Sequence, residues 1–292
     1  MVGCRYRGDE RRTGSMIPPI ANNFVAGESP AEAVQHAREL NRRDVAVILN
    51  LLGEHYDDRA DADADADAYI DLAETIAEDD LDACISVKPS QIGLSLSDDA
   101  FCENLARIVA VADDHGVFVW IDMEDHTTTD ATLDAFEHHA REHGGVGVCL
   151  QANLRRTRAD IERLSGVSGK IRLVKGAYDP PADLAYRDSA RVDEAYEDLL
   201  ELLFREYDGT VAVGSHDPAM LAAAERFGEA YGREFEVQML MGVREDAQRE
   251  LAADREVWQY APYGEKWASY FYRRVLERTE NLTFAARAVL GG

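Results

Sequence analysis

The feature that most constrains the fold of this sequence is a regular alternation of short apolar segments with longer amphipathic ones. Short, continuously apolar segments are typical of strands that are buried on both faces of a parallel sheet. We expect strands at 45–52, 82–88, 117–123, 145–151, 171–177, 210–215, 235–241 and 257–261. Eight strand–helix units predict an α/β fold of the (βα)8 TIM-barrel type. An open doubly wound sheet is the alternative, but no GxGxxG turn follows the first strand to support it.

The amphipathic segments between these strands predict helices. They lie at 31–40, 98–114, 130–143, 158–165, 188–207, 218–231, 244–253 and 265–278. The stretch 57–80 opens with an acidic Asp-Ala repeat at 61–68, which indicates a solvated linker or frayed helix start before a helix from about Tyr69. We expect residues 1–15 to be a disordered tail and residues 16–292 to form a single barrel domain, because no interdomain linker is visible.

The charge balance of the chain is strongly acidic. It has 56 acidic against 31 basic residues and a formal net charge of -25, which argues against binding to nucleic acids. Arginine replaces lysine almost everywhere, as in proteins of extreme halophiles, whose self-repulsion is screened by salt. The four remaining lysines, which we therefore expect to have specific roles, are Lys88, Lys170, Lys175 and Lys266.

Neither a disulfide framework nor a metal site is expected. The four cysteines lack a CxxC pair, and two of them lie in apolar strand segments, which favours buried reduced thiols. His138, His139 and His143 share a predicted helix without a matching acidic cluster, and we expect them at the surface. No apolar run is long enough to span a membrane, and the N-terminus lacks the apolar core of a signal peptide, so a cytoplasmic location is expected.

Polar and ionisable residues gather where the expected strands end. Because parallel strands bring their carboxyl ends to one rim of a barrel, these side chains are predicted to line a common site. Together with the small or apolar residues beside them, the residues at these strand ends are, in chain order, Lys88, Asp122, Met123, Glu124, Gln151, Arg172, Lys175, Gly176, Ala177, Tyr178, Ser215, His216, Asp217, Gln238, Leu240 and Tyr260. The contiguous Ser215-His216-Asp217 cannot form a hydrolase triad, because triad members come from separated positions.

The last predicted helix carries a second candidate feature. Tyr270, Arg273, Arg274 and Glu277 are spaced so that they share one helix face. Two adjacent arginines can grip a carboxylate through paired hydrogen bonds. A solvated basic helix end is the alternative.

Taken together, these motifs resemble those of the monofunctional proline dehydrogenases. The matching segments are Ser86–Leu94 (SVKPSQIGL), Asp122–Glu124, Leu150–Ala152, Arg172–Tyr178 (RLVKGAY), Ser215–Pro218, Tyr260–Gly264 and Tyr270–Arg278 (YFYRRVLER). The resemblance covers about Asn23 to Leu290. It implies a distorted (βα)8 barrel whose last helix lies over the C-terminal rim, and an FAD-dependent oxidation of L-proline to 1-pyrroline-5-carboxylate.

The resemblance also implies roles for individual residues. Arg273 and Arg274, helped by Lys88, resemble the clamp on the proline carboxylate. Tyr260 and Leu240 resemble walls that pack the pyrrolidine ring, with Tyr178 and Tyr270 nearby. Asp122 resembles an acid of the substrate pocket that belongs to a polar network with the lysine, and Arg172 is similar to the arginine near flavin N5. These two are the expected catalytic residues. The residues that resemble flavin contacts are Met123, Gln151, Arg172, Lys175, Gly176, Ala177, Ser215 and His216.

Two other kinds of function remain open at this point. Lys88 or Lys175 could form a Schiff base in a lyase or aldolase, or the barrel could be a non-catalytic binding protein. If the resemblance holds, the electron acceptor is expected to be a membrane quinone, which would place the chain at the inner face of the membrane. A separate pyrroline-5-carboxylate dehydrogenase would then consume the product.

Overall fold

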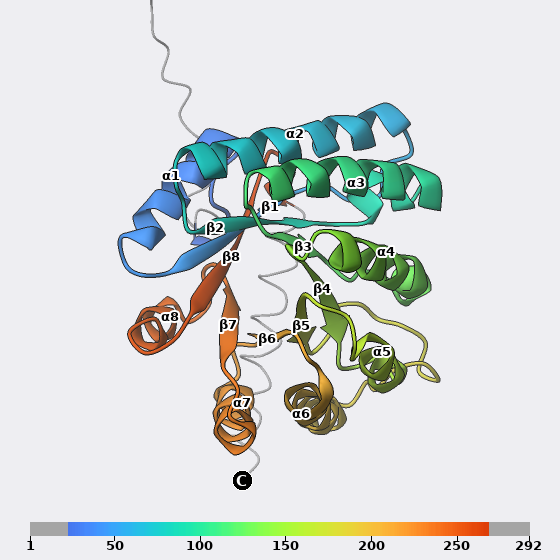
Figure 1. Cartoon of the computed structure of the whole chain (residues 1–292), viewed down its shortest axis with the longest axis vertical. Coiled ribbons are helices and arrows are strands. Elements are labelled where there is room, and N and C mark those ends of the chain that lie inside the picture. The colour runs from blue at the N-terminus through green and yellow to red at the C-terminus, as the bar shows by residue number, and fades with distance from the viewer. Residues whose placement is uncertain (1–22, 269–292) are drawn as a thin grey trace, which may run out of the picture.

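A computed structural model describes residues 23–268, and they form a closed barrel of eight parallel strands (Figure 1). Each strand pairs with its neighbours in sequence, and β8 closes the barrel against β1. The strands are β1 (Ala46–Leu51), β2 (Ala83–Val87), β3 (Val119–Ile121), β4 (Val146–Gln151), β5 (Lys170–Val174), β6 (Thr210–Gly214), β7 (Phe235–Leu240) and β8 (Val257–Tyr263). The expected (βα)8 barrel is therefore confirmed.

Helices surround the barrel (Figure 1). They are α1 (Pro30–Asn41), α2 (Arg59–Glu78), α3 (Asp98–Asp114), α4 (Thr129–Glu142), α5 (Thr157–Leu164), α6 (Ser189–Glu206), α7 (Pro218–Tyr231) and α8 (Glu245–Leu251). Two short helical turns, η2 (Ser90–Leu94) and η3 (His126–Thr128), follow β2 and β3 at the rim. Polar N-caps fix where several helices begin: Ser29 forms a capping box with Glu32, and Asp217 accepts a hydrogen bond from the Ala219 amide.

The helix α1 covers the seam where β8 closes against β1. It packs on both strands, and His36 Nε2 lies 2.7 Å from Gln259 Oε1 of β8. In a regular barrel a helix that follows β8 covers this seam. Because α1 occupies the seam, the barrel departs from the regular pattern. The predicted helix 265–278, and its placement over the rim, lie almost entirely outside the described residues.

Two expectations from the sequence are wrong. The Asp-Ala repeat is not a linker, because α2 begins at Arg59 and includes the whole repeat. Ala62 and Ala66 are fully buried, while Asp65 accepts hydrogen bonds from Tyr56 and Gln91. The repeat thus has an apolar alanine face, which a count of its acidic residues does not reveal.

His139 is the second correction, because its side chain is buried and not at the surface. It lies on the inner face of α4, while its neighbour His138 is exposed. The expectation for the cysteines holds in part: Cys84 and Cys149 are buried free thiols, whereas Cys102 is exposed on α3. Cys4 lies outside the described residues.

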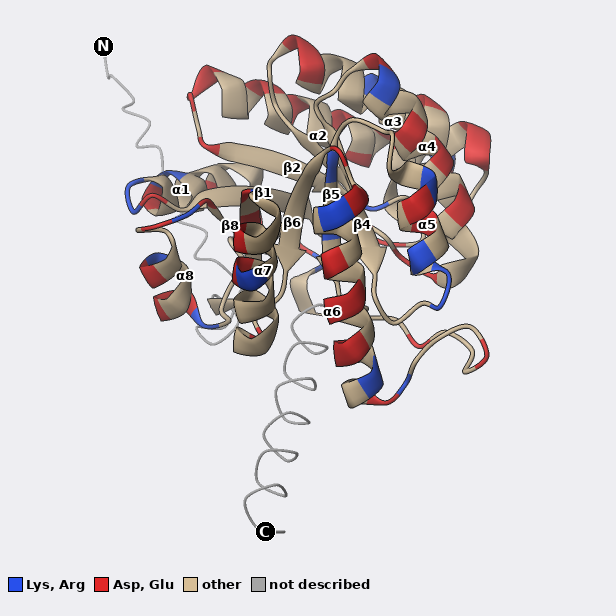
Figure 2. Ribbon diagram, turned by 60° about the horizontal axis from the view of Figure 1, so that its bottom comes forward, with Lys and Arg blue, Asp and Glu red and all other residues tan. Residues whose placement is uncertain are grey.

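Acidic side chains are spread over the outer helices (Figure 2). Many of the arginines among them are in ion pairs, such as Arg226 with Glu197 between α7 and α6. Within residues 23–268, the structure contains no helix with the length and apolarity that a membrane crossing requires.

Candidate active site

A cavity of about 660 Å³ lies at the carboxyl ends of the barrel strands. This volume is in the range of sites that hold small molecules or cofactors. Fifteen residues singled out from the sequence line it: Lys88, Asp122, Met123, Glu124, Arg172, Lys175, Gly176, Ala177, Tyr178, Ser215, His216, Asp217, Gln238, Leu240 and Tyr260. Gln151 does not line it but lies buried below the rim, where its Nε2 donates to the Glu124 carbonyl. Tyr270, Arg273, Arg274 and Glu277 lie outside the described residues.

The floor of this cavity is organised around the carboxylate of Asp122. Arg172 pairs with Oδ1 of this carboxylate, and Ser86 donates to the same oxygen at 2.7 Å. The Tyr260 hydroxyl donates to Oδ2 at 2.6 Å. Side chains from β2, β5 and β8 thus converge on a single carboxylate at the end of β3.

Arg172 is a buried cation inside the barrel, only 4% exposed. Its guanidinium lies 4.7 Å from the centre of the Trp120 ring and 5.5 Å from that of Tyr260, and its Nη1 donates to Gln238 Oε1 at 3.0 Å. Burial opposes the charge, but the Asp122 carboxylate outweighs this effect and raises the pKa of Arg172 above its usual value. The site therefore contains a fixed positive charge shielded from water.

Lys88 lies beside this cluster, just after β2. Its Nζ donates to Asn50 Oδ1 at 2.7 Å. The Asn50 amide is oriented by its other end, because Nδ2 donates to the Ser86 carbonyl at 2.8 Å. A buried asparagine therefore holds an ammonium group at the cavity wall.

The segment after β5 forms a second part of the wall. Lys175 Nζ lies 2.5 Å from Asp193 Oδ1 and 2.8 Å from Asp217 Oδ2. Burial lowers the pKa of Lys175, but these two carboxylates outweigh it and raise the pKa above the usual value. Arg172 lies on β5 and bonds to Gln238 inside the barrel, whereas Lys175 follows the end of β5 and contacts α6 and the residue before α7.

Gly176 is required at its position by two features of the backbone. Its φ is +112°, a conformation that favours glycine, and an added Cβ would lie 2.2 Å from Asn153 Oδ1. Asn153 is itself buried, and its Oδ1 has no hydrogen-bond partner within the described residues. Glycine at this position therefore leaves the space that the Asn153 side chain occupies.

At the ends of β6 and β7, the rim is held by backbone contacts. His216 Nε2 accepts from the Leu240 amide at 2.8 Å, which places the proton of a neutral imidazole on Nδ1. The Ser215 hydroxyl accepts from the Asp217 amide at 3.2 Å. These contacts give Ser215 and His216 fixed orientations at the edge of the cavity.

The sequence analysis did not single out three residues whose side chains hold charged groups at the rim. Ser86 bonds to Asp122, Asn50 holds Lys88, and Ser90 donates to Glu124 from both its amide and its hydroxyl, at 2.7 and 2.8 Å. A signal for Ser86 was present, since it lies two residues before Lys88 and side chains two apart on a strand share a face. Asn50 likewise is a polar residue within an otherwise apolar strand.

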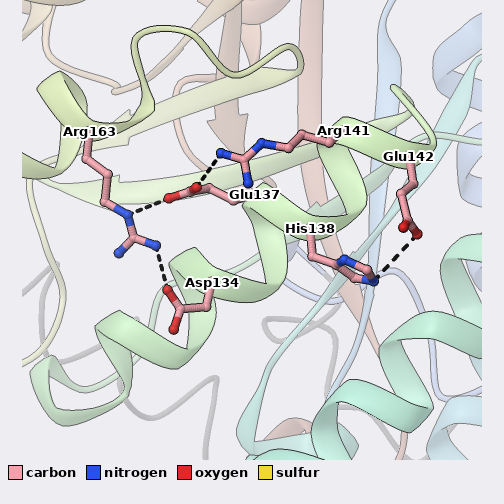
Figure 3. A pocket seen from close by; sticks show the side chains of 6 residues that line it. All are labelled: Asp134, Glu137, His138, Arg141, Glu142 and Arg163. Atoms are coloured by element: carbon pink, nitrogen blue, oxygen red, sulfur yellow. Dashed lines mark hydrogen bonds and ion pairs between the residues drawn. The ribbon is translucent and has the colours of Figure 1, made fainter.

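A second cavity, of about 310 Å³, lies outside the barrel between α4 and α5 (Figure 3). Its walls are exposed ion pairs, in which Arg163 contacts Asp134 and Glu137 while Arg141 contacts Glu137. Exposed pairs of this kind are screened by solvent and common on acidic surfaces. Since its charges are already paired and no strand end reaches it, the rim cavity is the better candidate for chemistry.

Comparisons with known proteins agree on one family. The model of the proline dehydrogenase family matches residues 33–287. A proline dehydrogenase of Deinococcus radiodurans is 38% identical over 94% of this chain and 91% of its own length. Proline dehydrogenase 2 of Bacillus subtilis is 32% identical over 96% of this chain and 92% of its own length. The crystal structure of proline utilization A from Bdellovibrio bacteriovorus, inactivated by N-propargylglycine, superposes with a TM-score of 0.83 at 25% identity, covering 89% of this chain and 32% of that one.

Proposed function

The chain belongs to the proline dehydrogenase family and is an oxidoreductase that acts on proline, and we propose that it uses FAD bound at the barrel rim to form 1-pyrroline-5-carboxylate. The observation that supports this site most strongly is the cluster on the cavity floor. There, Asp122 holds the buried guanidinium of Arg172 and the hydroxyl of Tyr260 in fixed positions.

The residues present fit a flavin. The cavity is large enough for a planar ring system. Its walls combine apolar groups such as Met123 and Leu240 with the cations Arg172 and Lys175. A flavin held there would supply a hydride acceptor, its N5 atom, for the ring carbon beside the proline amine.

Arg172 would act on the cofactor as a fixed charge. Because Asp122 keeps the guanidinium ionised and in place, it can stabilise negative charge that develops nearby without reorganisation of water. The residues that would hold the cofactor are Lys175, Gly176, Ala177, Met123, Ser215 and His216, with Gln151 supporting the strand end below them. These contacts are part of the proposal.

The substrate would lie between Tyr260 and Leu240, whose apolar surfaces suit a five-membered ring. Lys88, oriented by Asn50, would bind the carboxylate, and Tyr178 would border the pocket. Arg273 and Arg274, with Tyr270, would complete the clamp from outside the described residues. A carboxylate held at fixed points determines which ring carbon faces the cofactor.

Lys175 is poorly suited to Schiff-base chemistry. A nucleophilic lysine needs a lowered pKa. Lys175 instead carries two carboxylate partners, which outweigh the effect of burial, raise its pKa and disfavour a neutral amine.

We further propose that a membrane quinone reoxidises the cofactor while the chain lies at the inner face of the membrane, and that a separate pyrroline-5-carboxylate dehydrogenase consumes the product. Membership of the family supports both proposals.

The experiment that tests the proposed function is a chemical identification of cofactor and product. We expect acid extraction of the purified protein to release FAD, and turnover of L-proline with an artificial electron acceptor to give 1-pyrroline-5-carboxylate, trapped with o-aminobenzaldehyde. A colourless protein that borohydride inactivates only in the presence of substrate would instead support a lyase.

A further inference from the structure

A chain of polar side chains crosses the interior of the barrel below Arg172. Lys170 Nζ lies 2.5 Å from Glu236 Oε2 near the N-terminal mouth, and Gln238 Nε2 donates to Glu236 Oε1 at 2.6 Å. Gln238 Oε1 then accepts from Arg172 Nη1 at 3.0 Å. Glu236 and Gln238 are 1% and 4% exposed. Barrel interiors are usually filled by apolar branched side chains, so the buried Glu236 carboxylate, paired with the partly exposed Lys170, requires an explanation.

Strand geometry creates this path. Lys170 and Arg172 are two residues apart on β5, and Glu236 and Gln238 two apart on β7, so each pair points to the barrel interior. The strand between them, β6, contributes Ala212, which is in register with both Arg172 and Glu236. Because alanine is short, the longer side chains meet across it.

The order of donors and acceptors fixes the Gln238 amide. A carboxylate only accepts hydrogen bonds, so Glu236 must face the NH2 end of Gln238, and the carbonyl end is thereby turned to Arg172. Lys170 balances the charge of Glu236: burial raises the pKa of Glu236, and the Lys170 ammonium opposes that rise.

We propose that Glu236 and Gln238 are positioning residues that hold the Arg172 guanidinium in place from below, while Asp122 holds it from above. The inference rests on the proposed function, because it assigns Arg172 to the cofactor. Arg172 would then have acceptors on two sides, and its position would not depend on the substrate.

Glu236→Gln tests this arrangement with almost no change in shape. The oxygen of the new amide must face the Lys170 ammonium, so its NH2 group faces Gln238. The Gln238 amide must then turn its oxygen to this NH2 group. Its own NH2 group comes to face Arg172, which loses an acceptor. We expect kcat to fall about 10-fold or more with KM for L-proline changed less than about 2-fold, because a transition-state interaction is weakened. Sulfite, which adds to flavin N5 as an anion, should bind about 10-fold more weakly, as measured by loss of the visible flavin band.

The double variant Glu236→Gln/Gln238→Glu restores the order of donors and acceptors. The new amide at position 236 can then donate to the new carboxylate at position 238, which again accepts from Arg172. We expect the double variant to recover kcat to within about 3-fold of wild type, which a role in packing alone does not predict. Glu197→Gln, which removes an exposed partner of Arg226, is the matched control and should change neither kcat nor sulfite binding.

The wild-type protein is measured first, and it should be yellow and bleach with L-proline. A wild type that does neither contradicts the proposed function and does not test the positioning role. Given a functional wild type, unchanged kcat and sulfite affinity in folded, flavin-loaded Glu236→Gln would overturn the inference. So would a double variant no better than the single one. If Glu236→Gln does not fold, Gln238→Met, which leaves Lys170 and Glu236 paired, is expected to show the same weaker sulfite binding, and normal binding there contradicts the proposal.

Discussion

Arg172 and Asp122 are ion-paired inside the barrel although they come from different parts of the chain, β5 and the end of β3. The hydroxyl groups of Ser86 from β2 and Tyr260 from β8 also donate hydrogen bonds to the Asp122 carboxylate. A buried cation is stable only if a partner compensates for lost hydration. The fold therefore supplies a fixed positive charge at the point where the proposed reaction needs one.

Asp122→Asn removes the compensating charge while keeping the shape. The Arg172 guanidinium is left buried without a counter-ion, and Tyr260 faces an amide. We expect kcat/KM for L-proline to fall about 100-fold, or about 2.7 kcal/mol, with FAD still bound. Ser86→Ala, which removes one hydrogen bond to the carboxylate but leaves the ion pair in place, should cost less than Asp122→Asn. Equal losses in the two variants would contradict the special role of the ion pair.

Gly176→Ala should weaken cofactor binding because the added Cβ collides with Asn153 at a positive φ. We expect the dissociation constant for FAD, measured by quenching of flavin fluorescence, to rise at least about 10-fold. Gly116→Ala is the matched control, since Gly116 also has a positive φ but an added Cβ there meets no atom within 4 Å. If both variants bind FAD normally, Gly176 is not part of the cofactor site.

Lys88→Met should raise KM for L-proline about 10-fold or more, because the ammonium that binds the carboxylate is lost while the length of the side chain is kept. Pyrrolidine, which has the ring but no carboxylate, should inhibit wild type and variant equally. Lys266→Met, which removes an exposed lysine beside Tyr56, serves as the control. A variant that loses pyrrolidine binding as strongly as proline binding would show that Lys88 shapes the pocket instead.

His139 makes stability depend on pH. Burial lowers the pKa of His139 to about 4 from its ordinary 6.5, with His138 and His143 adding to the effect. Between these pH values the unfolded chain binds the proton and the folded chain does not, so the free energy of unfolding decreases as pH falls from 6.5 to about 4. Above pH 6.5, the ordinary pKa of histidine, this loss of the free energy of unfolding is absent.

We expect the free energy of unfolding to fall by up to about 3 kcal/mol over this pH range because of His139, and we expect this fall to disappear in His139→Leu. Urea unfolding of both proteins at several pH values measures it. His138→Leu removes an exposed histidine that makes only a secondary contribution to the lowered pKa of His139, and it should keep most of the wild-type slope. If the slope of His139→Leu equals that of wild type, another group causes the dependence.

The strand–helix order and most of the rim could be predicted from the sequence. Parallel strands place every carboxyl end on one side, so Lys88, Asp122, Arg172 and Tyr260 could be grouped without knowing any distance.

What could not be predicted depends on contacts across the barrel. Gln238 can bond to both Glu236 and Arg172 because the β6 residue between the two strands, Ala212, has a short side chain. The sequence of 210–215 alone does not show that Ala212 lies in register with Arg172 and Glu236. The buried position of His139 depends on which face of α4 meets the barrel. The Asp-Ala repeat has the composition of a linker, whereas its alanines pack as a helix face.

The most direct test of the proposed function is an anaerobic titration of the purified protein with L-proline, followed by its visible absorbance. We predict a yellow protein whose flavin band bleaches on addition of L-proline, with one 1-pyrroline-5-carboxylate formed per flavin reduced. A protein that binds FAD but keeps its full absorbance in excess L-proline would contradict the proposed function.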